Sequence, residues 1–197
     1  MAGITRETII SAAVNLFNQN GYHATSMQDI AREVNIKKPS LYHHFQSKEE
    51  ILLSILETGM VDLVTEVETI ARSGQPCEQK LRSAIRAHAL TIGANPQAAT
   101  VFLREDRGLG ENYMQRYIAQ RDQVEAAFRS IVEQGITEGV FQVPDLSITV
   151  QAVLGVVNWM SRWYRPSGRL SAGEIADLFA ELLLNGLLAG ARNPQDQ

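Results

Sequence analysis

Apolar residues recur at intervals of three and four positions along almost the whole chain, as they do in amphipathic α-helices. No segment shows a strong alternation of apolar and polar positions, which is the pattern of a half-buried strand. The periodic segments are about 5–20, 26–34, 39–45, 47–72, 77–93, 96–107, 111–138, 145–163 and 171–190. We therefore predict an all-α protein of about nine helices.

Residues with strong end preferences mark several helix boundaries. Gly21 and Gly139 follow the ends of two helices, where glycine is the commonest C-terminal residue. Ser47 and Ser171 each begin a capping box that a glutamate completes three residues later. The break at 73–76 contains Gly and Pro and separates the long fourth helix from the helices that follow.

The segment 26–48, SMQDIAREVNIKKPSLYHHFQSK, has the pattern of two short helices joined by a tight turn. Ser26 is a favourable N-cap, and Asp29 adds negative charge to the first turn. Asn35 stands where the turn needs a residue that tolerates positive φ. Pro39 suits the first turn of the second helix, where its missing N–H is not needed.

The second short helix presents polar chemistry on its outward side. Leu41 and Phe45 are four residues apart, so they share a face and point inward. The residues left facing outward are basic, hydroxylic or aromatic: Lys37, Lys38, Ser40, Tyr42, His43 and His44. A short helix with such a face suits the major groove of DNA, so we predict a DNA-binding function.

The stretch TSMQDIAREVNIKKPSLYHHFQSKEEIL resembles the DNA-binding signature of the TetR family of bacterial one-component transcription regulators. The resemblance implies a helix-turn-helix DNA-binding domain over 1–48 and a helical ligand-binding and dimerisation domain over 49–197. Two positions depart from the family pattern, which usually has Gly at Asn35 and often Ser or Thr at Lys37.

The expected DNA contacts combine this resemblance with the outward face. The resemblance places Thr25 against a phosphate, and Lys48 lies in the first turn of the next helix. We expect Tyr42, His44 and Lys48 to contact phosphates, with Lys38 and Ser40 near base edges. The full predicted set is Thr25, Lys37, Lys38, Pro39, Ser40, Tyr42, His43, His44 and Lys48.

Charge and composition change this picture only slightly. The net charge of −4 argues against nucleic acid, but residues 1–48 alone carry +2 and the remaining residues carry −6. No signal peptide and no membrane-spanning run is present in the sequence, so we expect a cytoplasmic protein. The single cysteine, Cys77, follows Pro76; we expect a surface thiol without a role, with redox sensing as the alternative.

The last two helices predict a homodimer. The segments 150–160 and 178–188 are apolar on nearly every side, so each must be covered on more than one face. A second subunit that forms a four-helix interface would provide that cover, whereas in a monomer both helices would be central. Charge introduced at Val153 or Leu183 is then expected to yield monomers.

Residues 102–107 and 158–163 of the second domain suggest an effector site, because both segments place charged or polar side chains beside apolar ones. Trp159 and Trp163 are four apart, and Asn158 and Arg162 share the neighbouring face. An arginine beside tryptophans could bind an anionic, partly apolar molecule, although the tryptophans could equally be core or interface residues. The predicted ligand-binding set is Phe102, Arg104, Tyr113, Tyr117, Asn158, Trp159, Arg162 and Trp163.

A second resemblance narrows the effector. NWMSRWYRPSGRLSAGEIADLF, together with the upstream FLRE and YIAQRD stretches, resembles the C-terminal domain of a TetR subgroup that often responds to acyl-coenzyme A thioesters. It implies a regulator of fatty acid, sterol or aromatic acid breakdown. The alternative within this class is a repressor of an efflux pump that senses lipophilic drug-like compounds.

No catalytic, metal or cofactor site can be assembled from the sequence. His43 and His44 are adjacent and point apart, and neither His23 nor His88 has an acidic or cysteine partner at metal-binding spacing. We therefore predict no metal, no cofactor and no enzymatic activity. The sequence indicates a homodimeric repressor that a small amphipathic effector releases from a pseudo-palindromic double-stranded DNA operator, without a membrane partner.

Overall fold

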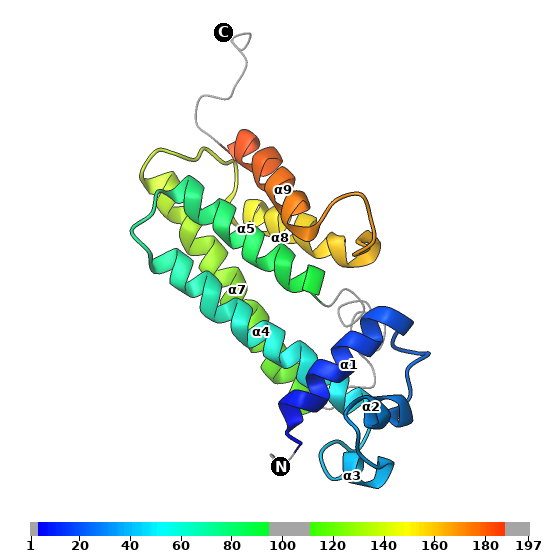
Figure 1. Ribbon diagram of the computed structural model, residues 1–197. Coiled ribbons are helices and arrows are strands. Elements are labelled where there is room, and N and C mark those ends of the chain that lie inside the picture. Colours follow the sequence, from blue (N-terminus) through cyan, green and yellow to red (C-terminus); the bar gives the residue numbers. More distant parts are fainter. Residues whose placement is uncertain (1–3, 95–110, 188–197) are drawn as a thin grey trace. The chain divides into compact units, whose positions relative to one another are not determined.

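The computed structural model describes residues 4–94 and 111–187, which form eight helices and no strand (Figure 1). The prediction of an all-α fold is therefore confirmed. The helices are α1 (Arg6–Asn20), α2 (Met27–Glu33), α3 (Lys38–Tyr42), α4 (Lys48–Arg72), α5 (Cys77–Ala94), α7 (Glu111–Thr137), α8 (Leu146–Trp163) and α9 (Ala172–Leu187). The helix expected over 96–107 lies outside the described residues.

The chain divides into two compact units, and α4 contributes to both. Among the described residues, unit 1 contains 4–59 and unit 2 contains 60–94 and 111–187. The sequence suggests a boundary at the start of the long helix. In the structure the division falls inside α4, because Ile51, Leu52 and Ile55 are buried in the core of unit 1.

Unit 1 is built from α1, α2, α3 and the first turns of α4. Ile9, Ala13 and Phe17 on α1 pack with Ile30 of α2 and Leu41 of α3 in one apolar cluster. The stripes that the periodicity predicts are thus the faces that meet. Burial of these side chains stabilises helices too short to form alone, such as the five-residue α3.

The helix ends follow the predicted capping chemistry. The Ser26 hydroxyl accepts a hydrogen bond from the Asp29 N–H at 3.2 Å, and the Asp29 carboxylate accepts one from the Ser26 N–H at 3.0 Å. Ser171 and Glu174 form the same reciprocal pair at the start of α9. At α4 the pattern differs, since the Glu50 carboxylate accepts from the Gln46 N–H instead of that of Ser47.

The turn between α2 and α3 depends on Asn35, whose φ is +53°. The N–H of Ile36 donates to the Ala31 carbonyl at 2.9 Å, and the N–H of Asn35 donates to the Arg32 carbonyl at 3.1 Å. This pair of bonds is the Schellman arrangement, which places one residue in the left-handed region. The expectation that Asn35 adopts positive φ is confirmed.

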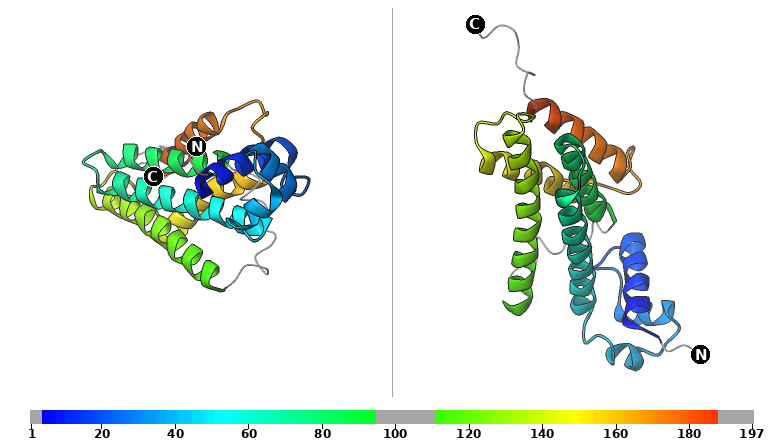
Figure 2. Two further views of the ribbon diagram at one scale, coloured as in Figure 1. Left: turned by 60° about the horizontal axis from the view of Figure 1, so that its bottom comes forward. Right: turned by 90° about the vertical axis from the view of Figure 1, so that its left-hand side faces the viewer.

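Unit 2 is arranged around α5, which packs against α7, α8 and α9 (Figure 2). Leu81, Ile85 and Ile92 of α5 are buried among residues of these helices and of the second half of α4. None of the helices in the described ranges combines the length and apolar character needed to cross a membrane.

Two polar residues of α5 are buried near the end of α4. The Lys80 ammonium donates to the carbonyl of Ala71 and to the side-chain oxygen of Gln134, both at 2.9 Å. Cys77 is buried, and its thiol lies 3.3 Å from the Glu138 carboxylate. Burial, more than this carboxylate, raises the pKa of the Cys77 thiol. The expectation of a surface thiol is wrong, because the first turn of α5 faces the core of unit 2.

Replacement of Asn35 tests the turn. Asn35→Ala is expected to lower the free energy of unfolding by about 1 kcal/mol, because a Cβ without a compensating polar side chain disfavours positive φ. Asn35→Gly is the matched control and should change stability by at most a few tenths of a kcal/mol, since glycine adopts this conformation freely. Urea unfolding of both variants provides the measurement. Equal stability of the two would contradict this account of the turn.

Candidate functional site

The outward side of α3 and the residues next to it form a solvent-exposed face, here called the reader face. It consists of Lys37, Lys38, Pro39, Ser40, Tyr42 and His43, all of which are exposed. Lys38 Nζ lies 5.8 Å from the centre of the Tyr42 ring. The face therefore presents two ammonium groups, a hydroxyl, a phenol and an imidazole on a single short helix and its flanks.

The buried side of α3 is held by apolar contacts and by Arg6 of α1. Leu41 and Phe45 are fully buried, as their spacing predicts. The Arg6 guanidinium lies 3.8 Å from the centre of the Phe45 ring and donates to the His44 carbonyl. It also donates to the Glu50 carboxylate at 3.2 Å, so one side chain joins α1, the end of α3 and the first turn of α4.

Lys48 makes a second connection between α4 and the rest of unit 1. Its ammonium donates to the carbonyls of Tyr22 and Thr25, at 2.6 and 2.8 Å, and lies 4.2 Å from the centre of the Tyr22 ring. The Tyr22 hydroxyl in turn donates to the Glu49 carboxylate at 3.3 Å. These contacts fix the loop between α1 and α2 to the first turn of α4.

Thr25 is placed differently from what the resemblance suggests. Its side chain is only 2% exposed, and its hydroxyl donates to the Gly21 carbonyl at 2.9 Å. The hydroxyl therefore stabilises the loop from within and does not face solvent. In this conformation a phosphate contact near Thr25 would have to use other groups of the loop.

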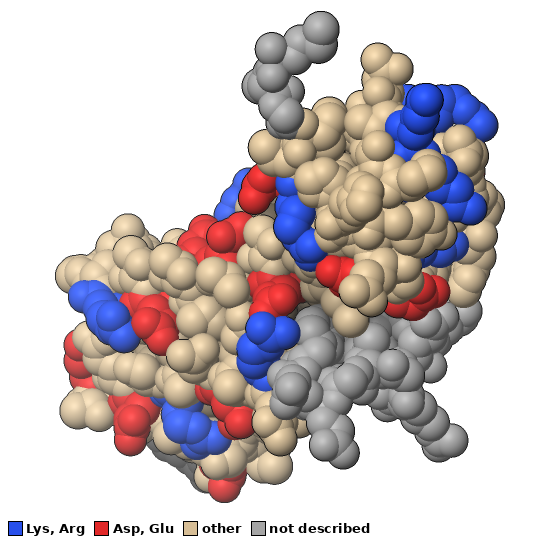
Figure 3. All heavy atoms as spheres, turned by 90° about the horizontal axis from the view of Figure 1, so that it is seen from below, with Lys and Arg blue, Asp and Glu red and all other residues tan. Residues whose placement is uncertain are grey.

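The charges of unit 1 are distributed unevenly. Arg6 pairs with Glu50 and Arg32 pairs with Asp29, whereas Lys37 and Lys38 form no ion pair with any described residue. Figure 3 looks onto this unit and shows lysine and arginine side chains around its surface. The two lysines of the reader face are thus available to an anionic partner.

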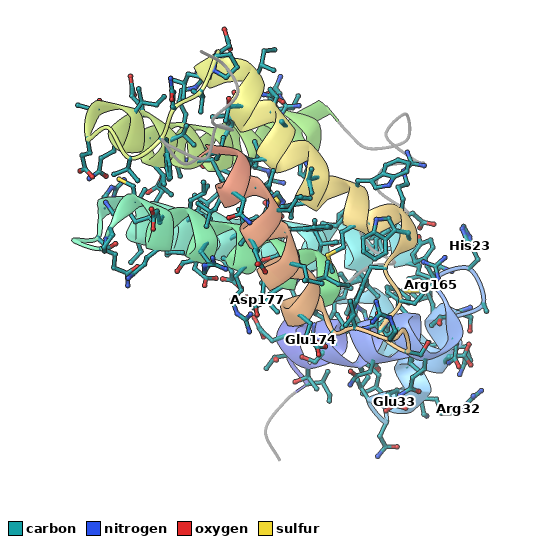
Figure 4. All side chains as sticks on the ribbon, turned by 90° about the horizontal axis from the view of Figure 1, so that it is seen from above. His23, Arg32, Glu33, Arg165, Glu174 and Asp177 are labelled. Atoms are coloured by element: carbon teal, nitrogen blue, oxygen red, sulfur yellow. The ribbon has the colours of Figure 1, made fainter. Side chains whose placement is uncertain are left out.

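The histidines do not form a metal site. His23 lies in the loop between α1 and α2 (Figure 4), whereas His43 and His44 directly follow α3. Within 4–94 and 111–187, no group of three or more His, Cys, Asp or Glu side chains could hold a metal ion.

The structure describes only part of the predicted effector site. Phe102 and Arg104 lie outside the described residues, and of Tyr113 only the backbone in α7 is described. Tyr117 is half-buried on α7, and burial raises the pKa of its phenol.

The four predicted effector residues on α8 lie on the surface of unit 2. Trp159 is 64% exposed, and Asn158 and Arg162 are exposed beside it. Trp163 is partly covered by Phe179 of α9, with an edge-to-face contact of 6.3 Å between ring centres. Within a single chain, the tryptophans therefore do not line an interior cavity.

Trp159 belongs to an outward apolar face, here called the α8/α9 face. On α8 it consists of Ile148, Ala152, Gly155 and Trp159, and on α9 of Leu178, Leu182 and Gly186. Apart from the chain neighbours and the backbone of the same helix, no atom of the described residues lies within 4 Å of where a side chain would begin at Gly155 or Gly186. Both helices could therefore approach another helix closely at these glycines.

This face corrects the choice of positions for testing a dimer. Val153 is only 1% exposed and Leu183 is half-buried against the core, so neither points outward. Because α8 and α9 are apolar on nearly every side, their sequences do not show which side of each helix is buried and which side forms the α8/α9 face. A charge at Val153 would disturb the core of unit 2 instead of an interface.

Two structurally important residues were not identified from the sequence. Arg6 contacts residues 38 to 48 positions away, so no local spacing could reveal its role. His88 lies on the buried side of α5, where its ring packs 6.1 Å from that of Phe128. Its place in the apolar stripe of that helix was the available signal.

Two protein-family models match separate parts of this chain. The family model described as bacterial regulatory proteins of the tetR family matches residues 9–55. A second model, described as the C-terminal domain of tetracyclin repressor-like proteins, matches residues 74–187.

Individual relatives cover nearly the full chain. The HTH-type transcriptional repressor KstR2 of Mycobacterium tuberculosis is 30% identical over 185 residues, which are 92% of each chain. The crystal structure of PfmR from Thermus thermophilus has a TM-score of 0.78 and 37% identity, and the match covers 90% of this chain and 97% of PfmR. The fold also resembles that of AibR in complex with isovaleryl coenzyme A and operator DNA, at a TM-score of 0.69 and 24% identity over 93% of this chain and 97% of AibR.

Proposed function

The chain belongs to the TetR family of bacterial transcriptional regulators, and we propose that it is a homodimeric repressor released from its operator by an amphipathic effector. DNA binding is supported by the reader face, which exposes two lysines, a hydroxyl and an aromatic side chain. The opposite side of α3 is held by buried apolar contacts, and Arg6 contacts Phe45 at its end. Repression is supported by the similarity to KstR2, which is itself named a repressor.

We assign the reader residues to two kinds of contact. Lys38 and Ser40 would approach base edges, because they lie on the exposed first turn of the short helix. Tyr42 and His44 would contact phosphates, and Lys48 would contribute charge from the first turn of α4. Lys37 and His43 flank this helix and complete the proposed surface.

The proposed phosphate contact of Lys48 can be tested separately from its structural contacts with the loop between α1 and α2. If its ammonium contacts a phosphate, Lys48→Ala should weaken binding about equally to all sequences and reduce the slope of log affinity against log salt by about one. Arg82→Ala is the matched control, because Arg82 is an exposed cation on α5, within unit 2. Fluorescence anisotropy at several salt concentrations measures both slopes. An unchanged slope together with a lower melting temperature would limit Lys48 to fixing the loop.

Dimerisation is supported by the α8/α9 face. Ile148, Trp159, Leu178 and Leu182 are large apolar side chains left exposed on two helices that contact each other, and exposed apolar surface of this kind marks interaction sites. A two-fold arrangement would bury this face against its own copy as a four-helix interface. It would also present two reader faces to paired half-sites about one helical turn of DNA apart, or a multiple of that.

A charge on the α8/α9 face tests this assembly. Leu182 is 68% exposed, so Leu182→Glu should leave the fold of unit 2 intact while it places a charge in the interface. The variant is expected to sediment as a monomer at micromolar concentration and to bind operator poorly. Leu90→Glu, at another exposed leucine on α5, should remain dimeric. A wild-type monomer under these conditions would end the dimer proposal.

The proposed effector is an acyl-coenzyme A thioester of lipid or aromatic acid catabolism. Its anionic part would meet arginines, and Arg162, Arg165 and Arg169 are exposed at the end of α8 and just beyond it. Figure 4 labels Arg165 of this group. The apolar part would lie among the long helices near Tyr113 and Tyr117, with Phe102 and Arg104 as further candidates from the adjoining segment. Trp159 belongs to the outward α8/α9 face and is not assigned to this interior site. AibR indicates that a protein of this fold can hold an acyl thioester.

The proposed release mechanism uses α4. Its first turns are bound to α1, to the end of α3 and to the loop before α2 through Arg6 and Lys48, and the same helix continues into unit 2. A shift of α4 therefore carries the reader face with it unless these contacts break. An effector that prefers the shifted arrangement lowers operator affinity by its differential affinity for the two states.

An effector titration tests the proposed ligand class. Acyl-coenzyme A thioesters of increasing chain length are added to the operator complex of the wild type and of the Arg162→Ala, Arg104→Ala and Arg82→Ala variants. At least one thioester should release the DNA. The concentration for half release should rise roughly tenfold in the first two variants, equivalent to about 1.4 kcal/mol, and stay unchanged in Arg82→Ala. Release by a neutral or cationic lipophile, and by no thioester, would favour an efflux-pump repressor instead.

A further inference from the structure

Unit 2 contains a buried polar atom that its own chain leaves unsatisfied. His88, on α5, is 8% exposed, and its ring packs against Phe128 of α7. Among the described residues, its Nδ1 is the one buried side-chain nitrogen or oxygen without a hydrogen-bond partner. Such atoms are rare in native proteins, because burial removes water without supplying a replacement.

The ring is neutral, and this determines what Nδ1 can do. Burial lowers the pKa of His88 to about 4, although a hydrogen bond with the Asn158 side chain acts in the opposite direction. The Asn158 side chain is the hydrogen-bond partner of the ring, whereas Nδ1 has none, so we assign the ring proton to Nε2 and the lone pair to Nδ1. In this tautomer the unsatisfied atom is an acceptor.

The surroundings of His88 coincide with the proposed effector region. Tyr117, Val124 and Phe128 are separated by seven and four residues on α7, so they share one side of that helix. Phe128 contacts the His88 ring, and Asn158 of α8 is the hydrogen-bond partner of that ring. A molecule lying along this side of α7 would meet apolar walls and a single unsatisfied acceptor.

From this arrangement we infer that His88 Nδ1 is a ligand-binding atom, which accepts a hydrogen bond from a hydroxyl or amide N–H on the effector. This inference rests on the proposed function and adds to it the kind of effector group, a hydrogen-bond donor, that meets this atom. Two sources could supply that donor: a hydroxyl on the acyl chain, or an amide of the pantetheine arm. An effector carboxylate is disfavoured at this position, because two acceptors would then face each other.

The test compares matched ligands on matched variants. Acyl and 3-hydroxyacyl-coenzyme A of equal chain length are titrated against the operator complexes of the wild type, His88→Leu and His88→Gln. His88→Leu removes the acceptor and keeps an apolar side chain, whereas His88→Gln restores an acceptor. Thermal unfolding and effector-free operator affinity show that each variant is folded.

A hydroxyl donor predicts that His88→Leu raises the half-release concentration of the hydroxylated thioester roughly tenfold and leaves that of the plain thioester unchanged. A pantetheine amide donor predicts an equal rise for both ligands. In either case His88→Gln should recover part of the loss. Nitrogen NMR of histidine-labelled protein should also show the Nδ1 resonance of His88 moving toward hydrogen-bonded values when the effective thioester is added.

The contrary outcomes are separable. If the wild type and His88→Leu respond equally to both ligands, and the Nδ1 resonance does not move, His88 is not a ligand contact and the thioester proposal stands. If no thioester releases the wild-type complex, the proposed effector class fails, and this inference fails with it.

Discussion

The first turns of α4 belong to the core of unit 1, and two cationic side chains hold them there. Arg6 joins these turns to α1 and to the end of α3, and Lys48 joins them to the loop before α2. Beneath both contacts, Ile51, Leu52 and Ile55 are buried in the same cluster as Leu41 and Phe45. The orientation of the reader face thus depends on α4 as well as on α2, because α3 has only five residues and packs against α2 and into this shared cluster. The turn at Asn35, the buried hydroxyl of Thr25 and the capping bonds of α2 all support this single arrangement.

The features that could be predicted from the sequence are those decided by neighbouring residues. Helix positions followed from apolar periodicity, and Ser26, Asn35 and Gly139 marked helix ends because their side chains or backbone preferences act within a few residues. The exposure of Lys38 and Tyr42 followed from the same periodicity, since Leu41 and Phe45 define the opposite side. The resemblance to the family signature added the DNA-binding function to a surface whose chemistry already suggested it.

The features that could not be predicted depend on residues far apart in the sequence. Nothing near Arg6 indicates that its guanidinium meets His44 and Glu50, and nothing near Lys48 indicates that its ammonium binds two carbonyls of an earlier loop. The same limit explains the positions of Val153 and Leu183. On helices that are apolar on nearly all sides, periodicity cannot distinguish the buried side from the α8/α9 face, and only the packing of α5 against both helices does so. Cys77 was misplaced for a related reason, because a helix start near a Pro-containing break need not be exposed.

The contacts of Arg6 and Lys48 with α4 determine how large a change the proposed effector must cause to release the operator. Arg6 bonds the first turn of α4 to α1, and Lys48 bonds it to the loop between α1 and α2. A displacement of α4 would therefore move the reader face together with the rest of unit 1, without unfolding that unit. Each 1.4 kcal/mol of preference for the displaced state lowers operator affinity tenfold. In the proposed site, the free energy of this preference would come from two chemically different contacts of the effector. Exposed arginines after α8 favour an anionic group, whereas the neutral His88 acceptor favours a donor and has no charge to attract an anion. A molecule with only one of these groups would gain part of the preference and release the operator less effectively. Selectivity for an amphipathic effector would then arise from two chemically different contacts that one ligand must satisfy together.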